Sequence, residues 1–191
     1  WEEIKKPNPP KLTDFNKVRI ADEKDVPEDV KAALADKNIC YGDVKIGDTA
    51  VTLLYKITVT GEKGASYTVS DEMNGKKATL ISGSLTGTFA EAGSVDIYVT
   101  MTFTREEINE GKITNIATLK PDEGTDPSIP GGGTAETPAG KTYNVTINFK
   151  TDDENPEILK DPIKDTYDNG TEYSYTVESA EGIALLADNV P

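Results

Sequence analysis

The stretch VDIYVTMTFTREEINEGKITNIATL, residues 95–119, contains two strands of one predicted β-domain and the turn that joins them. Its first half alternates apolar and polar residues with a period of two, which is typical of a half-buried strand. Thr104 and Glu107 have the spacing of a capping box, and Gly111 ends what can be only a short helical turn. The second half predicts a closing strand that places the following residues on one face: Ile113, Asn115, Ala117 and Leu119.

Asn115 is the unusual member of that face. A carboxamide that leaves water loses its hydrogen bonds to solvent, so it needs partners inside the protein or a chemical role. The other residues of the face are apolar, as expected for a strand that lies on a core. Asn115 is therefore the first candidate for a functional residue.

The composition excludes several classes of function. The chain has 191 residues and a formal net charge of −14, which disfavours binding to nucleic acid or to anionic membrane surfaces. It contains no histidine and a single cysteine, Cys40, which rules out an internal disulfide, a cysteine metal cluster and the histidine-based catalytic arrangements. We expect a non-enzymatic protein without metal or cofactor, in which Cys40 is a small buried residue.

Turn signals separate further strands along the first part of the chain. Val51–Thr60 alternates most clearly, and Tyr67–Asp71 follows it after a glycine turn. Ala78–Thr88 alternates weakly and contains glycines, which favour a bend or a bulge. Asp25 and Pro27 predict the start of a short helix that runs to about Asp36.

Roughly seven short strands in about 110 residues predict an immunoglobulin-like β-sandwich with a short helix. We place this domain at residues 12–121, after an extended lead-in at residues 1–11. Residues 122–141 contain several prolines and the run Gly131–Gly133 without apolar periodicity, so they predict a linker.

Alternation resumes at Thr142–Lys150, and residues 142–191 predict a small second β-domain. About fifty residues is near the lower limit for an independent core, so we expect this domain to be incomplete or to lean on a neighbour. No apolar run approaches the ~18 residues of a membrane-spanning helix. Because the chain begins at Trp1 without a methionine, we expect a piece of a longer protein.

Three motifs within residues 12–121 resemble the repeat domains of Gram-positive surface proteins. These motifs are Tyr55-Lys-Ile-Thr-Val-Thr-Gly61, Tyr67-Thr-Val-Ser-Asp71 and Gly111-Lys-Ile-Thr-Asn-Ile-Ala-Thr-Leu119. Such repeats are immunoglobulin-like sandwiches that serve as stalk modules, and they are similar to fimbrial and collagen-adhesin domains that form internal isopeptide bonds. The resemblance implies an extracellular stalk or adhesin module of a cell-surface protein, anchored to the cell wall through parts outside this chain.

The same resemblance implies a Lys–Asn isopeptide bond between the first and the closing strand. The implied residues are Lys17, Asn115 and a mid-domain acid, either Asp71 or Glu72. The reaction needs an amine that burial neutralises, an asparagine carbonyl within reach, and an acid that polarises it and moves protons. Each residue also has an ordinary alternative: Lys17 could extend to solvent at a sheet edge, Asp71 could begin a turn, and Asn115 could bind a loop.

Residues 142–191 resemble the mucin-binding-protein type of repeat, a small β-grasp-like domain of bacterial adhesins. The motifs that carry this resemblance are Tyr143-Asn-Val-Thr-Ile-Asn-Phe149, Asp161-Pro162 and Tyr167-Asp-Asn-Gly-Thr-Glu-Tyr173. Glu154-Asn-Pro156 departs from the family, which usually has a glycine turn there.

Two alternatives to a stalk remain open. One domain could bind a host ligand such as a mucin glycan or a matrix protein, and the aromatic candidates for that contact are Tyr167, Tyr173 and Tyr175. The chain could also be an accessory module of a secreted polysaccharide-active enzyme, because such enzymes carry similar domains.

Overall fold

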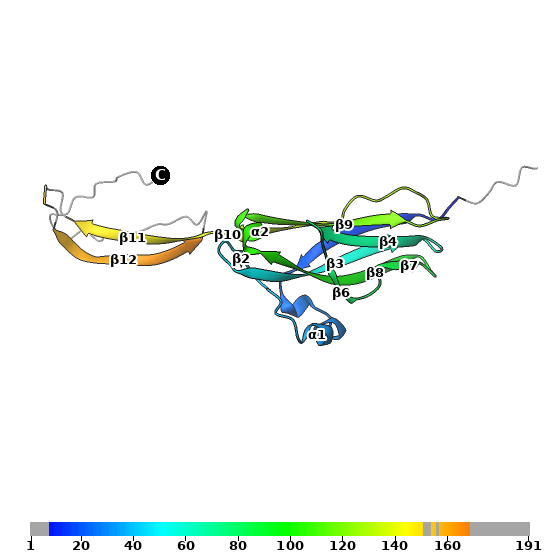
Figure 1. Ribbon diagram of the computed structural model, residues 1–191, viewed down its shortest axis with the longest axis horizontal. Helices are drawn as coiled ribbons and strands as arrows, with labels where there is room; N and C mark the ends of the chain where they lie inside the picture. Colours follow the sequence, from blue (N-terminus) through cyan, green and yellow to red (C-terminus); the bar gives the residue numbers. More distant parts are fainter. Residues whose placement is uncertain (1–7, 151–153, 156, 169–191) are drawn as a thin grey trace, which may run out of the picture. The chain divides into compact units, whose positions relative to one another are not determined.

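The computed structural model describes residues 8–150, 154–155 and 157–168 (Figure 1). These residues form mostly β-strands, which confirms the predicted all-β class. The chain divides into two compact units, Trp1–Thr142 and Tyr143–Pro191. Within the described ranges, no helix has the length and the apolar character needed to cross a membrane.

One sheet of the first unit has four antiparallel strands in the order β1-β3-β8-β6. Their bounds are Leu12–Ile20 for β1, Ala50–Gly61 for β3, Thr79–Ser82 for β6 and Gly93–Thr104 for β8. The central strands β3 and β8 pair along their whole length, from Ala50 opposite Thr104 to Gly61 opposite Gly93. They are also the two strands whose alternation is clearest in the sequence.

The second sheet has the order β2-β10-β9-β4-β5, and β7 also pairs with β4. The bounds are Val44–Lys45 for β2, Ser66–Met73 for β4, Lys76–Lys77 for β5, Thr86–Thr88 for β7, Lys112–Pro121 for β9 and Thr134–Gly140 for β10. The pairing of β10 with β2 is parallel, and the other recorded pairings in this sheet are antiparallel.

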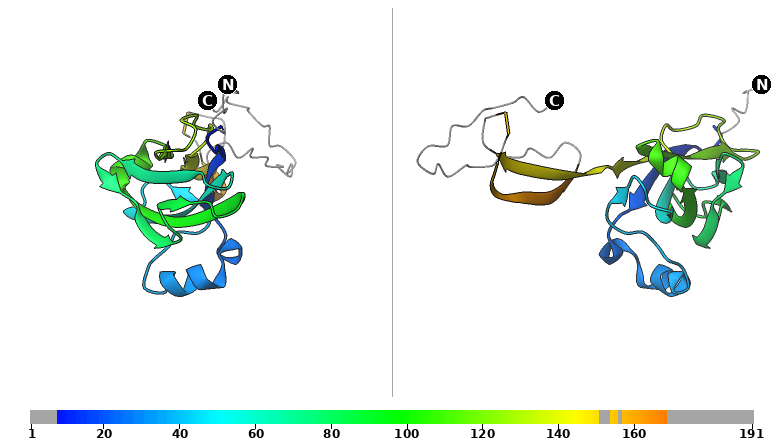
Figure 2. Two further views of the ribbon diagram at one scale, coloured as in Figure 1. Left: turned by 90° about the vertical axis from the view of Figure 1, so that its right-hand side faces the viewer. Right: turned by 60° about the vertical axis from the view of Figure 1, so that its left-hand side comes forward.

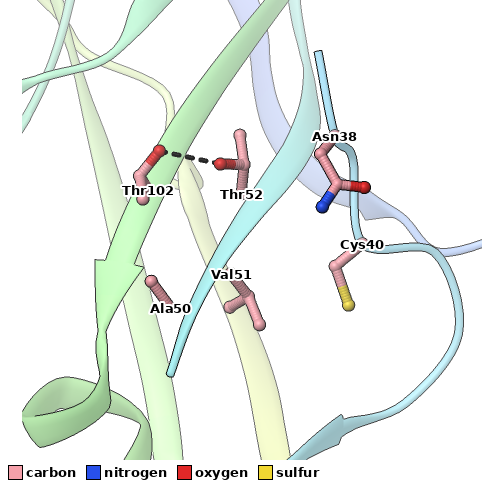
Figure 3. Close-up of a pocket in the computed structure, with 6 residues that line it drawn as sticks. All are labelled: Asn38, Cys40, Ala50, Val51, Thr52 and Thr102. Carbon is pink, nitrogen blue, oxygen red and sulfur yellow. Dashed lines mark hydrogen bonds between the residues drawn. The ribbon is translucent and has the colours of Figure 1, made fainter. Parts of the chain in front are cut away.

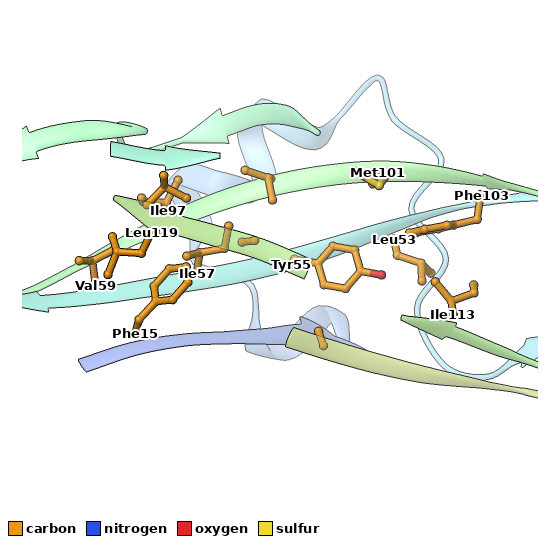
Figure 4. Packing of buried hydrophobic residues seen from close by; sticks show 14 of the residues in the cluster. Phe15, Leu53, Tyr55, Ile57, Val59, Ile97, Met101, Phe103, Ile113 and Leu119 are labelled. Atoms are coloured by element: carbon orange, nitrogen blue, oxygen red, sulfur yellow. The ribbon is translucent and has the colours of Figure 1, made fainter. Parts of the chain in front are cut away.

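The two sheets share one apolar core. Phe15, Tyr55 and Ile57 come from the first sheet, while Ile113 and Leu119 come from the second, and all are buried in the same cluster (Figure 4). Each strand contributes every second residue, because successive side chains of a strand point to opposite faces. The inner faces of β1, β4 and β9 therefore decide which polar residues enter this core.

Helix α1 (Glu28–Leu34) covers the outer side of the first sheet (Figures 1 and 2). Its buried residues Val30 and Leu34 pack with Leu54 and Tyr98, which point outward from β3 and β8. The helix starts later than the sequence predicted. Asp22 caps a separate 3₁₀ turn at Glu23–Asp25, and Pro27 is the residue before the first turn of α1.

The turn between β8 and β9 matches the prediction. Helix α2 (Arg105–Asn109) begins with a complete capping box, in which the Thr104 side chain accepts from the Glu107 backbone and Glu107 accepts from Thr104. Gly111 follows with a φ of 85°, a left-handed conformation that suits glycine. The face of Ile113, Asn115, Ala117 and Leu119 on β9 is buried as predicted.

Strand β10 lies inside residues 122–141, which the sequence predicted to be a linker. Ala135, Thr137 and Ala139 are buried on its inner face, and β10 pairs with β9 from Thr134 to Pro138. The inward residues are small and only weakly apolar, so their period of two carries little hydrophobic signal. The first unit consequently extends beyond Pro121, the predicted end of the sandwich.

The predicted strand Ala78–Thr88 is two strands. It breaks at Gly83, which has a φ of 86° and lies so close to the Asp96 carbonyl that a Cβ would meet it at 2.6 Å. Before the break β6 pairs with β8, and after it β7 pairs with β4 in the other sheet.

The described part of the second unit is a two-stranded sheet of β11 (Thr142–Lys150) and β12 (Ile158–Asp168). Strand β11 coincides with the alternating segment Thr142–Lys150 of the sequence. The rest of the proposed β-grasp-like domain, residues 169–191, lies outside the described residues.

Candidate crosslink site

Lys17 and Asp71 form an ion pair inside the core of the first unit. The Lys17 Nζ lies 2.6 Å from the Asp71 Oδ2, and the two side chains are 0% and 1% exposed. Lys17 belongs to β1 of one sheet and Asp71 to β4 of the other. The pair therefore bridges the two sheets instead of lying on a solvated surface.

The strand period explains why these charged residues are buried. On β1, Lys17 alternates with exposed residues and shares its face with the buried Phe15. On β4, Asp71 follows Tyr67 and Val69 on the inner face. Glu72, the alternative acid, is exposed on the opposite face of β4, so only Asp71 enters the site.

Asn115 lies next to this pair on the inner face of β9. It is 0% exposed, and neither its Nδ2 nor its Oδ1 has a hydrogen-bond partner. Asp71 is directly opposite Ala117 in the β4–β9 pairing, two residues along from Asn115. Asp71 and Asn115 are therefore diagonal neighbours on one face, a spacing at which side chains can meet.

Burial pushes both members of the ion pair toward their neutral forms. Desolvation lowers the pKa of Lys17, against the hydrogen bond and charge of Asp71. Desolvation likewise raises the pKa of Asp71, against the hydrogen bond and charge of Lys17. A neutral amine is a nucleophile and a protonated carboxyl is a proton donor, so both shifts favour the protonation states that acyl transfer to lysine requires.

Two hydroxyl groups complete the polar cluster. Tyr55 on β3 and Thr137 on β10 are buried, and neither hydroxyl has a hydrogen-bond partner. The Tyr55 ring lies beneath the amine, with its centroid 4.7 Å from the Lys17 Nζ. Sequence reasoning missed both residues, because Tyr55 fits an apolar strand face and Thr137 lies in the predicted linker.

The aromatic candidates for ligand contact are not tested by this geometry. Tyr167 belongs to β12, but its side chain lies outside the described residues, as do Tyr173 and Tyr175. Among the residues that the structure describes, no group of three or more His, Cys, Asp or Glu side chains could hold a metal ion.

A shallow pocket elsewhere in the first unit contains Cys40 (Figure 3). It is lined by Asn38, Cys40, Ala50, Val51, Thr52 and Thr102. The hydroxyl groups of Thr52 and Thr102 are 2.8 Å apart and satisfy each other. Cys40, which the sequence predicted to be buried, is half-buried and packs against the core, and its thiol makes long contacts with backbone carbonyls.

No known protein family, curated protein or solved structure matches this chain. The chemistry of Lys17, Asp71 and Asn115 is therefore the ground on which a function can be assigned.

Proposed function

We propose that the first unit is a structural stalk module in which an amide bond joins Lys17 to Asn115. The observation that carries the proposal is the buried Lys17–Asp71 pair beside a fully buried asparagine that lacks hydrogen-bond partners. The two facing sheets support an immunoglobulin-like arrangement, and we place the protein outside the cell as part of a surface-anchored chain.

The reaction needs no external reagent. The neutral Lys17 amine attacks the Asn115 Cγ, and the negative charge of the tetrahedral intermediate develops on Oδ1. Asp71 gives its proton to the Asn115 Nδ2, which leaves as ammonia, and takes a proton from the attacking nitrogen. One C–N bond forms, one C–N bond breaks, and Asp71 ends as it began.

The unreacted arrangement does little for stability, which favours a chemical role. Two buried charges lose hydration that their attraction seldom repays, and replacing such pairs by apolar residues is often neutral or stabilising. An unsatisfied buried carboxamide group costs about 1–3 kcal/mol. Amide formation removes the lysine charge and converts the asparagine, so it relieves both costs.

The bond would also stabilise the unit by restricting its unfolded chain. It joins residue 17 to residue 115, and a crosslink around a loop of roughly 100 residues contributes about 4.7 kcal/mol in the chain-entropy description. The chain has a single cysteine and so forms no internal disulfide, which leaves this amide bond as its covalent staple. Such a staple suits a module that carries load between a surface and a distal domain.

The intact mass under denaturing conditions tests the bond. We expect the wild-type chain to weigh one ammonia less than its sequence, and Asn115→Ala to have the full mass expected for its own sequence. Asn16→Ala is the matched control, because Asn16 is exposed on the opposite face of β1 next to Lys17. It should retain the deficit.

Peptide mapping then locates the bond. Trypsin should leave Lys17 uncut and release a branched peptide that joins the segment ending at Arg19 to the segment starting at Ile113. This distinguishes the crosslink from a succinimide at Asn74-Gly75, which loses ammonia without joining two segments. A full-length mass, or a deficit without the branched peptide, would refute the proposal.

A further inference from the structure

Three polar side chains meet in the core of the first unit: Tyr55, Asn115 and Thr137. Of these three, only Asn115 has a role in the acyl transfer as described so far. The Asn115 and Thr137 side chains lie close enough to the Tyr55 hydroxyl to favour its ionised form, although burial raises the pKa of Tyr55 far more strongly. None of the three groups closes a hydrogen bond of normal geometry. The cluster thus gathers two hydroxyl donors around one carboxamide without satisfying any of them.

The crosslinking reaction has a need that Lys17 and Asp71 do not meet. When the amine attacks, charge moves onto the Asn115 Oδ1, and a dry core offers no water to stabilise it. Lys17 is the nucleophile, and Asp71 moves protons between the two nitrogens. A separate set of donors aimed at the oxygen would lower the barrier, because pre-oriented donors act most strongly in a water-excluded site.

We propose that the Tyr55 and Thr137 hydroxyls form the oxyanion hole for the Asn115 carbonyl during amide formation. This inference rests on the proposed function, because it assigns roles in that same reaction. Neither hydroxyl is bonded to Oδ1 before the reaction, and both donate hydrogen bonds to it as the carbonyl oxygen becomes negative.

Tyr55 is held rigidly enough for this role. It lies on the central strand β3, and its ring packs edge-on against Phe103 with centroids 6.5 Å apart. The same ring lies beneath the Lys17 amine, so one side chain contacts the nucleophile and faces the electrophile. Because burial raises the pKa of Tyr55, the phenol stays protonated and acts as a donor.

Thr137 is placed by the pairing of β10 with β9. Thr137 is opposite Ile113 and Ala135 is opposite Asn115, so Thr137 and Asn115 are diagonal neighbours on the inner face. Thr137 is 1% exposed. Since β10 is the last strand of the unit in chain order, the second donor arrives only when this strand has paired.

The experiment measures the rate of crosslinking during synthesis of the full chain. Protein is made in a short cell-free pulse, samples are quenched in denaturant over time, and the fraction lacking one ammonia is followed by intact mass. We expect Tyr55→Phe and Thr137→Val each to slow crosslinking by about 100-fold, the usual effect of removing one oxyanion donor. The branched peptide that finally forms should be unchanged.

Matched variants separate the hydroxyls from the packing around them. Tyr67→Phe and Thr100→Val remove hydroxyls from other buried residues and should leave the rate at the wild-type value. Thr137→Ser keeps the hydroxyl but loses the methyl group, whereas Thr137→Val keeps the volume. The inference expects Thr137→Ser to react faster than Thr137→Val, and a packing role gives the reverse order.

The outcomes are distinguishable from those that test the bond itself. If wild type crosslinks and both Tyr55→Phe and Thr137→Val react at its rate, the oxyanion hole is refuted while the bond stands. If wild type never loses ammonia, both proposals fail together. The folding stability of the Thr137 variants is compared in the Asn115→Ala background, where no crosslink forms. If Thr137→Val and Thr137→Ser are equally stable there and Thr137→Val crosslinks more slowly, the result supports the inference.

Discussion

At Lys17 and Asp71 the fold accepts two ionisable side chains where apolar residues would pack at lower cost. The neighbours of Lys17 on its face include Phe15, and those of Asp71 include Val69, so apolar side chains flank the pair on both strands. Their separation of 2.6 Å recovers part of the desolvation cost, and the shifts in both pKa values show that burial is the larger effect. This balance yields a prediction that does not depend on the crosslink.

The prediction concerns the free energy of unfolding in the Asn115→Ala background. Adding Asp71→Val alone should cost about 3–5 kcal/mol, because it leaves the Lys17 amine buried without a partner. Adding Lys17→Met and Asp71→Val together should be neutral or stabilising by up to about 4 kcal/mol. Urea denaturation gives both values, and a double variant as unstable as the single one would show that the pair holds the fold together.

The change in the free energy of unfolding caused by Lys17→Met and Asp71→Val together should also depend on pH. The folded pKa of Asp71 lies above its ordinary value of 3.8, so its contribution to stability is present below that pH and is lost as pH rises. The folded pKa of Lys17 lies below 10.5, so its contribution is present above that pH and is lost as pH falls. The stability that the double variant gains over its Asn115→Ala parent should therefore be largest near neutral pH and shrink toward both extremes of pH.

The two-residue period of side chains along a strand explains how much of the site the sequence could predict. A period of two places Lys17, Asp71 and Asn115 on apolar faces of three strands. The sequence left Glu72 open as the alternative acid, and the structure excludes it because Glu72 is exposed on the opposite face of β4. The period could not show that β1, β4 and β9 bring Lys17, Asp71 and Asn115 together, because contacts between sheets depend on the packing of the whole unit. The Tyr55 hydroxyl was hidden because tyrosine is common on apolar strand faces.

At the scale of elements, the sequence predicted those strands whose signals are local and strong. The strand–turn–strand unit of β8, α2 and β9 was predicted because long alternation flanks a capping box and a glycine. The short strand β2 and strand β10 were not, because β2 has two residues and the inner face of β10 carries Ala135, Thr137 and Ala139. The two strands pair in parallel although they are far apart in the sequence, and a local sequence pattern cannot predict such a pairing.

The glycines before β10 give a prediction at this scale. Gly132 has a φ of 130°, and a Cβ there would collide with the Phe15 carbonyl oxygen. Gly133 has a φ of 83°, and a Cβ there would lie 2.5 Å from the Ala117 carbonyl oxygen. Gly132→Ala and Gly133→Ala should each destabilise the unit by more than about 2 kcal/mol, through clash and backbone strain.

Gly131 is the matched control for both variants. It belongs to the same run, has no strained φ, and has nothing within 4 Å of an added Cβ. Gly131→Ala should be neutral or stabilise by up to about 1 kcal/mol, because alanine restricts the unfolded chain. Denaturation of the three variants in the Asn115→Ala background measures this, and equal values at all three positions would contradict the close approach of this segment to β1 and β9.

At the scale of the whole unit, the position of the proposed bond decides which residues can extend under load. When the two ends of the chain are pulled apart, the force reaches the first unit through β1, which contains Lys17. It leaves the unit through the part of the chain that follows Asn115. With the amide bond in place, the force passes from residue 17 directly to residue 115. Residues 18–114 are then shielded, while β10 and the loop before it stay outside the covalent path.

Single-molecule stretching of the full chain, tethered at its two ends, tests this path. In wild type, the first unit should lengthen only by residues outside 17–115, each adding about 3.5 Å. In Asn115→Ala, residues 18–114 should extend as well, so the unit should lengthen much further when it unfolds. Asn16→Ala, which keeps the bond, should behave as wild type does. Equal extension of wild type and Asn115→Ala would mean that the bond carries no load, and the stalk role would have to be abandoned.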